Sequence, residues 1–452
     1  MSVSELESAF DLKELFFSKT DLKGIIQSGN AVFIRVSEFS EEELLKKPHN
    51  IIRHGDMPRS VFKLFWNFLK EGKPIAAYVK NKSKKGRYYW VFAMAFPMQD
   101  GYLSVRLKPT SSLFLKVQEL YKEVLALEAE GASLEDGIEF INRTLQSLGF
   151  SSYEEFMKKA LVEELVSRDT LLMESGKSVV NTKKSVKGSI DNFLAISDSC
   201  TSAARQSFAK TRLLFDKLKD LVKESQAIVK TCRDVKYVTV NLTISSAKLG
   251  DSGRPLSVVS NNLEKLTGEI AQSSSQFEEI FKSYEKSVFD MYFSIATSRF
   301  QIEMMKHLTD EVLEESQNSG EFTNAQEQFL FFNCSLLRKL ISENFSKVTA
   351  TSAELVRTNK SLLISVEALS KVTAGMGVIH VVGKIEMART GSSSDSLASR
   401  LKEMEELTEV FKKTLKNLEQ ECSMGLAICN ELNGHNQIIT NDLKRIDQLI
   451  AV

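Results

Sequence analysis

A short stretch near the N-terminus, residues 50–62 (NIIRHGDMPRSVF), brings together side chains that could do chemistry. Arg53, His54 and Asp56 fall within four positions, and Pro58 follows them. An arginine offers a planar fork of donors to a phosphate or a ring carbonyl, and an aspartate can accept an N–H from a ligand ring. An aspartate with a proline soon after it also predicts a capped helix N-terminus. For Asp56 we weigh capping and cofactor support equally, and the two roles can hold together.

Catalysis by His54 has little support in the rest of the sequence. No serine or cysteine nucleophile motif accompanies it, and the 5 histidines form no spaced pair that would suit a metal. The 5 cysteines form no CxxC pair, and their scatter is typical of buried thiols in a reducing cytosol. A glycine-rich ATP-binding signature is also missing, which disfavours a sensor histidine kinase. We therefore expect a chain that is not an enzyme and that holds no metal.

The elements around this stretch predict a small mixed domain. Apolar residues recur at every second position in residues 74–81, 87–96 and 101–107, with polar, glycine-bearing linkers between them. This pattern predicts three antiparallel strands with one buried face. Short helices are expected at residues 40–47 and 59–72. We therefore expect residues 1–110 to form an α+β domain, an antiparallel sheet with flanking helices.

From about residue 160 the sequence follows a seven-residue rhythm. Leu214, Leu221 and Ile228 begin one run, and similar runs occupy residues 263–291, 348–376 and 404–418. Breaks rich in glycine and serine fall near residues 249–255, 317–324 and 390–396. Sustained heptads predict supercoiled helices, so we expect four long helices joined by three turns in an all-α rod. Residues 111–170 are expected to be a helical connector that either passes on strain or serves as a passive spacer.

The rod is expected to contain two similar hairpins, residues 171–316 with a tip at 249–255 and residues 317–452 with a tip at 390–396. Around the two tips, Ile244 and Ala247 have the same spacing as Ile385 and Ala388. Matching residues of the two hairpins keep a constant separation in sequence across the tip. This favours duplication of a helical hairpin over coincidence. One chain with two antiparallel coiled-coil hairpins could then form a four-helix bundle alone, as a pseudo-dimer.

Bulk composition narrows the possible partners and the location. Lysine plus arginine equals aspartate plus glutamate at 59 each, which argues against a nucleic-acid binder or a polybasic membrane binder. The acidic N-terminus is unlike a signal peptide, and no run approaches the roughly 18 apolar residues that span a bilayer. We expect a soluble, cytoplasmic protein with no membrane span.

The N-terminal motifs resemble the PAS domain of aerotaxis receptors. That group carries N-x-x-RHPDMP, a helix with a tryptophan, and VKNxxKxGxxYWV. The matching elements here are Asn50 with residues 53–58, Trp66, and residues 79–91, and Gly55 stands in place of the usual proline. The resemblance covers about residues 15–110 and implies a non-covalent FAD whose redox state reports oxygen or electron transport. It implies these flavin contacts: Asn30, Arg53, His54, Asp56, Trp66 and Asn81.

Residues 240–270 resemble the hairpin tip of methyl-accepting chemotaxis receptors, which binds the chemotaxis histidine kinase and its coupling protein. The resemblance implies these partners, self-association through the rod, and a tip made of Asn241, Lys248, Gly250, Arg254, Val258, Glu386 and Arg389. Ser245, Arg233 and Pro255 differ from the residues that the family has at these positions. We therefore expect a redox-sensing transducer that acts on the chemotaxis kinase complex. The alternative is a scaffold of chemoreceptor arrays that controls no kinase.

Overall fold

The structure, a computed structural model, describes residues 6–175, 188–248, 254–319, 322–390 and 395–450. The chain separates into two compact units. The first comprises Met1–Arg205, Phe293–Phe345 and Ile438–Val452, and the second comprises Gln206–Tyr292 and Ser346–Gln437. The first unit holds the only sheet among the described residues, and the second unit is helical throughout them.

The N-terminal domain is built on a five-stranded antiparallel sheet with the strand order β2-β1-β5-β4-β3. Its strands are β1 (Phe16–Asp21), β2 (Ile26–Gly29), β3 (Ile75–Lys82), β4 (Tyr88–Met98) and β5 (Gly101–Leu107). The predicted α+β domain with its last three strands is confirmed. The sequence pattern missed β1 and β2, because β1 is buried along nearly its whole length and so shows no alternation.

The prediction of one buried face is wrong, because both faces of the sheet are covered. On one face Phe92 packs against Tyr78, with ring centroids 4.9 Å apart, and Tyr78 stacks on Phe114 of helix α4 (Ser112–Ala129) at 5.5 Å. On the other face, Ala93 and Ala95 of β4 point toward α3 (Arg59–Lys70) across a cavity. Two covered faces explain why β4 is apolar at consecutive positions.

The N-terminal part of the first unit also contains several helices besides α3 and α4. They are α1 (Ala31–Ser37), α2 (Glu41–Leu44), a 3-10 turn η2 (His49–Ile52), α5 (Leu134–Ser147) and α6 (Tyr153–Glu174). The predicted cap of α3 by Asp56 is wrong. Instead, Glu128 of α4 accepts hydrogen bonds from the N–H groups of Arg59 and Ser60, at 2.9 and 2.8 Å. A carboxylate at a helix N-terminus satisfies free N–H groups and the helix dipole, whichever part of the chain supplies it.

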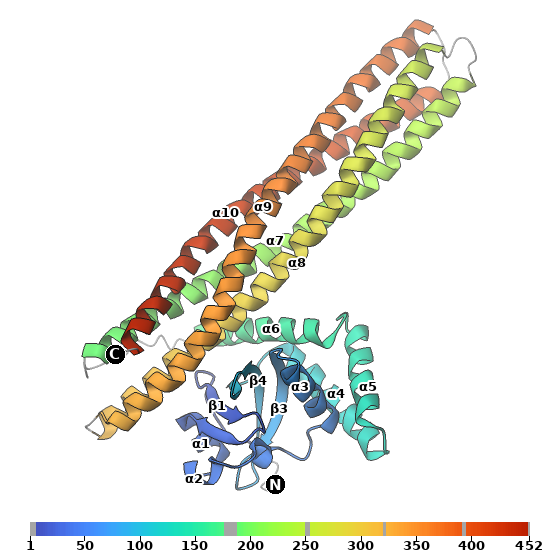
Figure 1. Cartoon of the computed structure of the whole chain (residues 1–452). Coiled ribbons are helices and arrows are strands. Elements are labelled where there is room, and N and C mark those ends of the chain that lie inside the picture. The colour runs from blue at the N-terminus through green and yellow to red at the C-terminus, as the bar shows by residue number, and fades with distance from the viewer. Residues whose placement is uncertain (1–5, 176–187, 249–253, 320–321, 391–394, 451–452) are drawn as a thin grey trace. The chain divides into compact units, whose positions relative to one another are not determined.

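After α6 the described residues form four long helices, as predicted (Figure 1). They are α7 (Gly188–Ala247), α8 (Arg254–Ser319), α9 (Asn324–Thr390) and α10 (Asp395–Ile450). In the second unit, heptad residues such as Leu214, Ile270, Leu355 and Phe411 are fully buried. Hydrogen bonds from Asn359 to Tyr284 and from Ser207 to Asn436 join α9 to α8 and α7 to α10 inside this bundle. The duplication of the two hairpins stays a prediction.

Among the described residues, one helix is long and apolar enough, by length and composition, to cross a membrane. It is the segment Asn324–Arg389, whose most apolar window has a mean hydropathy of 1.6 and is 28% buried. A core helix of a water-soluble protein passes the same test, so this property alone assigns no membrane to the chain.

Candidate functional site

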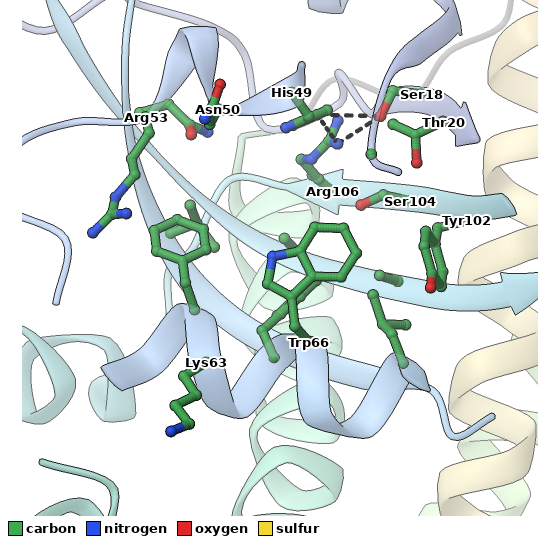
Figure 2. A pocket seen from close by; sticks show the side chains of 18 of the residues that line it. Ser18, Thr20, His49, Asn50, Arg53, Lys63, Trp66, Tyr102, Ser104 and Arg106 are labelled. Atoms are coloured by element: carbon green, nitrogen blue, oxygen red, sulfur yellow. Dashed lines mark hydrogen bonds between the residues drawn. The ribbon is translucent and has the colours of Figure 1, made fainter. Parts of the chain in front are cut away.

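A cavity of about 390 Å³ lies between α3 and the sheet face formed by β1, β3, β4 and β5. Figure 2 shows Trp66 rising from α3 toward the strands, with Arg106 of β5 behind it. This volume falls in the range of small-molecule sites, about 300–1,000 Å³. The lining residues are Ser18, Thr20, Gly24, His49, Asn50, Arg53, Arg59, Phe62, Lys63, Phe65, Trp66, Leu69, Val79, Asn81, Ala93, Ala95, Tyr102, Ser104, Arg106 and Leu134.

Small residues make room for this cavity. Ala93 and Ala95 present only methyl groups where a larger side chain on the same face of β4 would fill the space. At Gly24 the backbone φ is +78°, and an added Cβ would lie 3.2 Å from the ring of Trp66. A glycine here therefore serves both the turn between β1 and β2 and the close approach of the indole.

One wall of the cavity is aromatic. Phe62, Phe65 and Trp66 share one face of α3, because positions three and four apart on a helix point the same way. The Trp66 ring meets Tyr102 of β5 edge to face, with centroids 5.3 Å apart. Such a wall suits a planar, conjugated ligand, since aromatic rings bury large flat surfaces against one another.

The charges around the cavity have one sign. Arg53, Arg59, Lys63 and Arg106 line it, and no aspartate or glutamate is among the described lining residues. The chain as a whole carries as many acidic as basic residues, so this local excess is a property of the site. A concave surface lined by cations attracts anionic ligands.

His49 and Arg106 form a polar centre inside the cavity. The Arg106 Nη2 donates to Ser18 Oγ at 2.6 Å and lies 2.8 Å from His49 Nε2 (Figure 2). Burial and the nearby Arg106 charge lower the pKa of His49 to about 3, so its ring is neutral and Nε2 accepts the hydrogen bond. Burial also lowers the pKa of Arg106 to about 10, which leaves the guanidinium charged at neutral pH.

Arg53 occupies the rim of the cavity. Its Nη2 donates to the carbonyl oxygen of Met57 at 2.8 Å, and its guanidinium lies over the Phe62 ring, 4.4 Å from the centroid. Its backbone forms a bridge to Asn81 of β3, which also lines the cavity. Burial lowers the pKa of Arg53, and the Glu128 carboxylate opposes that shift. The turn that carries Arg53 is therefore fixed to both the sheet and α3.

The residues predicted to contact a flavin separate into two groups. Arg53, Trp66 and Asn81 line the cavity together with Asn50. His54 and Asp56 lie outside the lining, where the Asp56 N–H donates to His54 Nδ1 at 3.0 Å and Lys80 pairs with the Asp56 carboxylate at 2.6 Å. The hydrogen bond from Lys80 lowers the pKa of Asp56, whose side chain is 60% exposed.

Asn30 is buried away from the cavity lining, where it holds α1 and β1 in place. Its side-chain oxygen accepts from the N–H groups of Phe17 and Phe33, at 2.9 and 3.3 Å. Its amide nitrogen donates to the Leu15 carbonyl and to the Glu311 carboxylate of α8, both at 2.9 Å. Asn30 thus links the N-terminal domain to a long helix within the first unit.

Gly55 lies in an exposed turn, with open space where a Cβ would stand. The glycine that replaces the family's proline therefore does not touch the cavity wall.

The residues predicted for the hairpin tip lie near the ends of the long helices in the second unit. Asn241, Lys248 and Val258 are exposed, and Arg389 pairs with Glu386 at 3.2 Å. Gly250 lies outside the described residues, and the structure describes the backbone of Arg254 but not its side chain.

The flavin contacts predicted from the sequence left out many polar or aromatic lining residues: Ser18, Thr20, His49, Arg59, Phe62, Lys63, Phe65, Tyr102, Ser104 and Arg106. The polar members of the 101–107 alternation were assigned to solvent by default. A signal was present in Arg106, which sits between two apolar residues at the end of a strand, but only the pairing of β5 between β1 and β4 shows that its face is covered.

Comparison with known proteins finds similarity in the part of the chain that contains the sheet. Residues 28–104 match the family model described as the PAS fold. The chain is 41% identical to the aerotaxis receptor of Escherichia coli strain K12 over 114 residues, which are 24% of this chain and 22% of that protein. It is 23% identical over 131 residues to the biofilm dispersion protein BdlA of Pseudomonas aeruginosa strain PAO1, which covers 29% of each. The chain therefore covers less than a third of either relative.

Among solved structures, the light-state structure of the blue-light photoreceptor Aureochrome1 LOV is similar at 20% identity, with 24% of this chain and 90% of that chain covered and a TM-score of 0.21. The family match and the sheet together establish that the N-terminal part of this chain is a PAS domain, similar in sequence to a segment of the aerotaxis receptor.

Proposed function

We propose that this chain is a cytoplasmic sensory transducer of the aerotaxis type, without enzymatic activity of its own. In this proposal its PAS domain binds FAD, and the redox state of the flavin biases the long helices. The observation that carries the proposal is the cavity, which combines an aromatic wall with four cationic side chains and no described carboxylate in its lining. The similarity to the aerotaxis receptor points to the same kind of signal.

The residues of the cavity fit a flavin. Trp66 and Phe62 offer flat apolar surface to the ring, and Asn50 and Asn81 offer amide donors and acceptors to its polar edge. Arg53, Arg59 and Lys63 could pair with phosphate oxygens, for which guanidinium and ammonium groups are the usual protein partners. When bound, a flavin supplies a ring that accepts and returns electrons, and this chain's residues would hold and orient it in a largely apolar cavity.

A route from the cavity to the long helices is supported by contacts inside the first unit. The cavity strand β1 begins beside Leu15, whose N–H donates to His307 of α8 at 3.3 Å. Asn30 follows β2 and donates to Glu311, one turn further along α8. A change of ligand that moved β1 by a small distance would therefore alter two hydrogen bonds to the same helix. This makes α8 the first expected carrier of the signal.

Partner binding at the helix ends is part of the proposal, with the chemotaxis histidine kinase and its coupling protein as the expected partners. Exposed apolar side chains support it: Ile244 is 49% exposed, Val258 60% and Ile385 53%. Each lies near an end of a long helix, where it is available for contact with a partner. A scaffold that binds the same complex without control of its activity is the second candidate, because binding needs only these surfaces.

The first test is the visible absorption spectrum of the purified full chain, with and without added FAD. We expect bound-flavin bands, and we expect Trp66→Ala and Arg53→Ala to weaken FAD binding by about 10-fold or more each, since each removes a stacking face or a charge partner. Lys82→Met, on the exposed side of β3, is the matched control. A wild-type chain that stays colourless with excess FAD would sink the flavin proposal.

The second test separates the transducer from the scaffold. Autophosphorylation of the histidine kinase is measured with its coupling protein and this chain, in the oxidised and in the dithionite-reduced state. The transducer predicts a rate that changes with redox state and loses that change in a variant that binds no flavin. A chain that co-sediments with the kinase complex but leaves its rate the same in both states is a scaffold.

A further inference from the structure

We infer that Arg106 selects the negatively charged form of the cavity's ligand, because its buried guanidinium charge meets no carboxylate among the described residues. For the flavin of the proposed function, on which this inference rests, the selected form is the reduced ring. Arg106 would then set how readily the bound cofactor is reduced, as a specificity-determining residue of the site.

The first support is geometric. Arg106 lines the cavity and is only 4% exposed, so its guanidinium is largely removed from bulk solvent. Its Nη2 is used by Ser18 and His49, whereas its Nη1 is buried and has no hydrogen-bond partner among the described residues. A buried donor without an acceptor costs about 1–3 kcal/mol, and more when it is charged. The described residues therefore satisfy this charged group only in part, and the Arg106 side chain lies in the wall of a cavity.

The second support is the missing counter-charge. Among the described residues no carboxylate forms an ion pair with Arg106, and two titratable groups that interact with it, His49 and Tyr89, are neutral. His49 is held in the neutral form by burial, and burial likewise raises the pKa of the Tyr89 hydroxyl well above neutral pH. Buried charges are normally paired. In this inference, the bound ligand supplies the negative charge that pairs with Arg106.

The chemistry of flavin reduction supplies that charge. An external reductant gives two electrons to the ring, and uptake of one proton from solvent leaves one negative charge on it; no bond to the protein forms or breaks. A cation at the ring edge binds this reduced form more tightly than the oxidised form. By linkage, the ratio of the two affinities sets the shift of the midpoint potential, about 30 mV for each factor of 10 in a two-electron couple.

The test compares full-length wild type with Arg106→Met, Arg106→Lys and the control Lys82→Met. Affinity for FAD is measured in the oxidised and in the dithionite-reduced state, and the midpoint potential is measured with redox dyes. We expect Arg106→Met to weaken binding of the reduced form at least about 10-fold more than binding of the oxidised form, which lowers the potential by about 30 mV or more. Arg106→Lys keeps the charge and should keep most of the wild-type potential, and Lys82→Met should not change it.

The result that overturns the inference is equal weakening of both redox forms in Arg106→Met, with the potential unchanged. If Arg106→Met does not fold, as judged by circular dichroism, Arg106→Gln takes its place, because it keeps a donor and a similar shape without the charge. A wild-type potential in folded Arg106→Gln has the same meaning. Failure of the proposed function is separate: wild-type protein would then bind no flavin in either state.

Discussion

Two buried arginines of the first unit, Arg106 in the sheet and Arg299 in α8, differ in what surrounds them. Arg299 is 1% exposed and makes a two-pronged ion pair with Asp169, at 2.8 and 2.5 Å, and another with Glu303 at 2.9 Å. Arg106 is also buried, at 4% exposed, but among the described residues its polar contacts are the Ser18 hydroxyl and the neutral His49 imidazole, and its guanidinium lies over the Phe33 ring at 5.5 Å. Two carboxylates balance the Arg299 charge, whereas no carboxylate among the described residues balances the Arg106 charge.

The balanced network joins elements that are distant in sequence. Glu303 of α8 also pairs with Arg168 of α6 at 2.5 Å and with Arg205 of α7 at 3.1 Å, and Arg168 Nε donates to the Leu12 carbonyl at 2.8 Å. Burial alone would raise the pKa of Glu303, but Arg299, Arg168 and Arg205 more than offset it, so that pKa is lowered strongly. This cluster holds the connector, the N-terminal segment and two long helices together.

The difference between Arg299 and Arg106 suggests how to distinguish a buried charge that stabilises the fold from a buried charge that binds a ligand. A complete network satisfies each of its charges, so its removal affects folding. A buried charge without a carboxylate partner keeps a desolvation cost that the neighbouring side chains do not offset. Removal of such a charge is expected to change what the site binds and to affect folding little. The four predictions below test this distinction.

The largest effect is expected for Glu303→Gln. The substitution leaves Arg168 and Arg299 buried with less negative charge between them, which should lower the free energy of unfolding by about 3–5 kcal/mol. Urea denaturation followed by circular dichroism measures it, with Glu314→Gln on the exposed face of α8 as the control. A loss below about 1 kcal/mol, the value of a surface pair, would mean that the network is not structural.

The next effect is a pH dependence from His49. Its folded-state pKa of about 3 lies below the ordinary 6.5, so the unfolded chain takes up the proton first and stability is lost as the pH falls from 6.5 toward 3. The expected loss is about 1.4 kcal/mol per pH unit in that window. Glu303, whose folded pKa is also lowered, adds a loss only near and below its ordinary 4.5.

The variant His49→Asn isolates this contribution, because an amide still accepts from Arg106 but does not titrate. Between pH 6.5 and 4.5 its stability should fall less steeply than that of the wild type. Equal slopes in urea melts across this window would show that His49 is not a buried neutral group.

A smaller effect is expected for Glu128→Ala, which removes the carboxylate at the N-terminus of α3. Its contacts are the N–H groups of Arg59 and Ser60 and the Ser60 hydroxyl, the last at 2.7 Å, so its role is that of a helix cap. Loss of a cap costs about 0.5–2 kcal/mol. The thermal unfolding midpoint should fall accordingly, while Glu130→Ala at the end of α4 serves as the control. No change would show that solvent caps α3 equally well.

The smallest effect is expected for Arg106→Met in the ligand-free protein. The substitution removes a buried charge that has no carboxylate partner, so the free energy of unfolding should change by less than about 1 kcal/mol or should rise. Urea denaturation of flavin-free protein measures it. A loss comparable to that of Glu303→Gln would erase the distinction between the two arginines.

Much of the architecture could be predicted from residue patterns. The heptads at Leu214, Leu221 and Ile228 predict long helices, because burial along one helical stripe needs that spacing. The alternation at residues 101–107 predicts β5 in the same way. β1 was missed because a strand covered on both faces has no alternation to detect, and the helix cap was misassigned to Asp56 because Glu128 is 68 residues away from Ser60 in sequence.

The cavity could be predicted only in part. Arg53, Trp66 and Asn81 were found because they belong to a local motif, and the structure brings them into one lining. Asn30 was expected beside a ligand but caps α1 and meets Glu311, a partner 281 residues away. His49 and Arg106 are unremarkable in the sequence, since neither belongs to a motif.

The sequence by itself determined the periodicities, and with them the sheet strands after residue 74, the four long helices and the motif that encloses Arg53. The tertiary structure alone decided which charges are balanced. Whether a buried arginine meets a carboxylate depends on contacts between elements far apart in the chain, and local spacing contains no information about them. For this reason Arg299 lies in a balanced ion-pair network and Arg106 lines a cavity, although both are arginines in regular secondary structure.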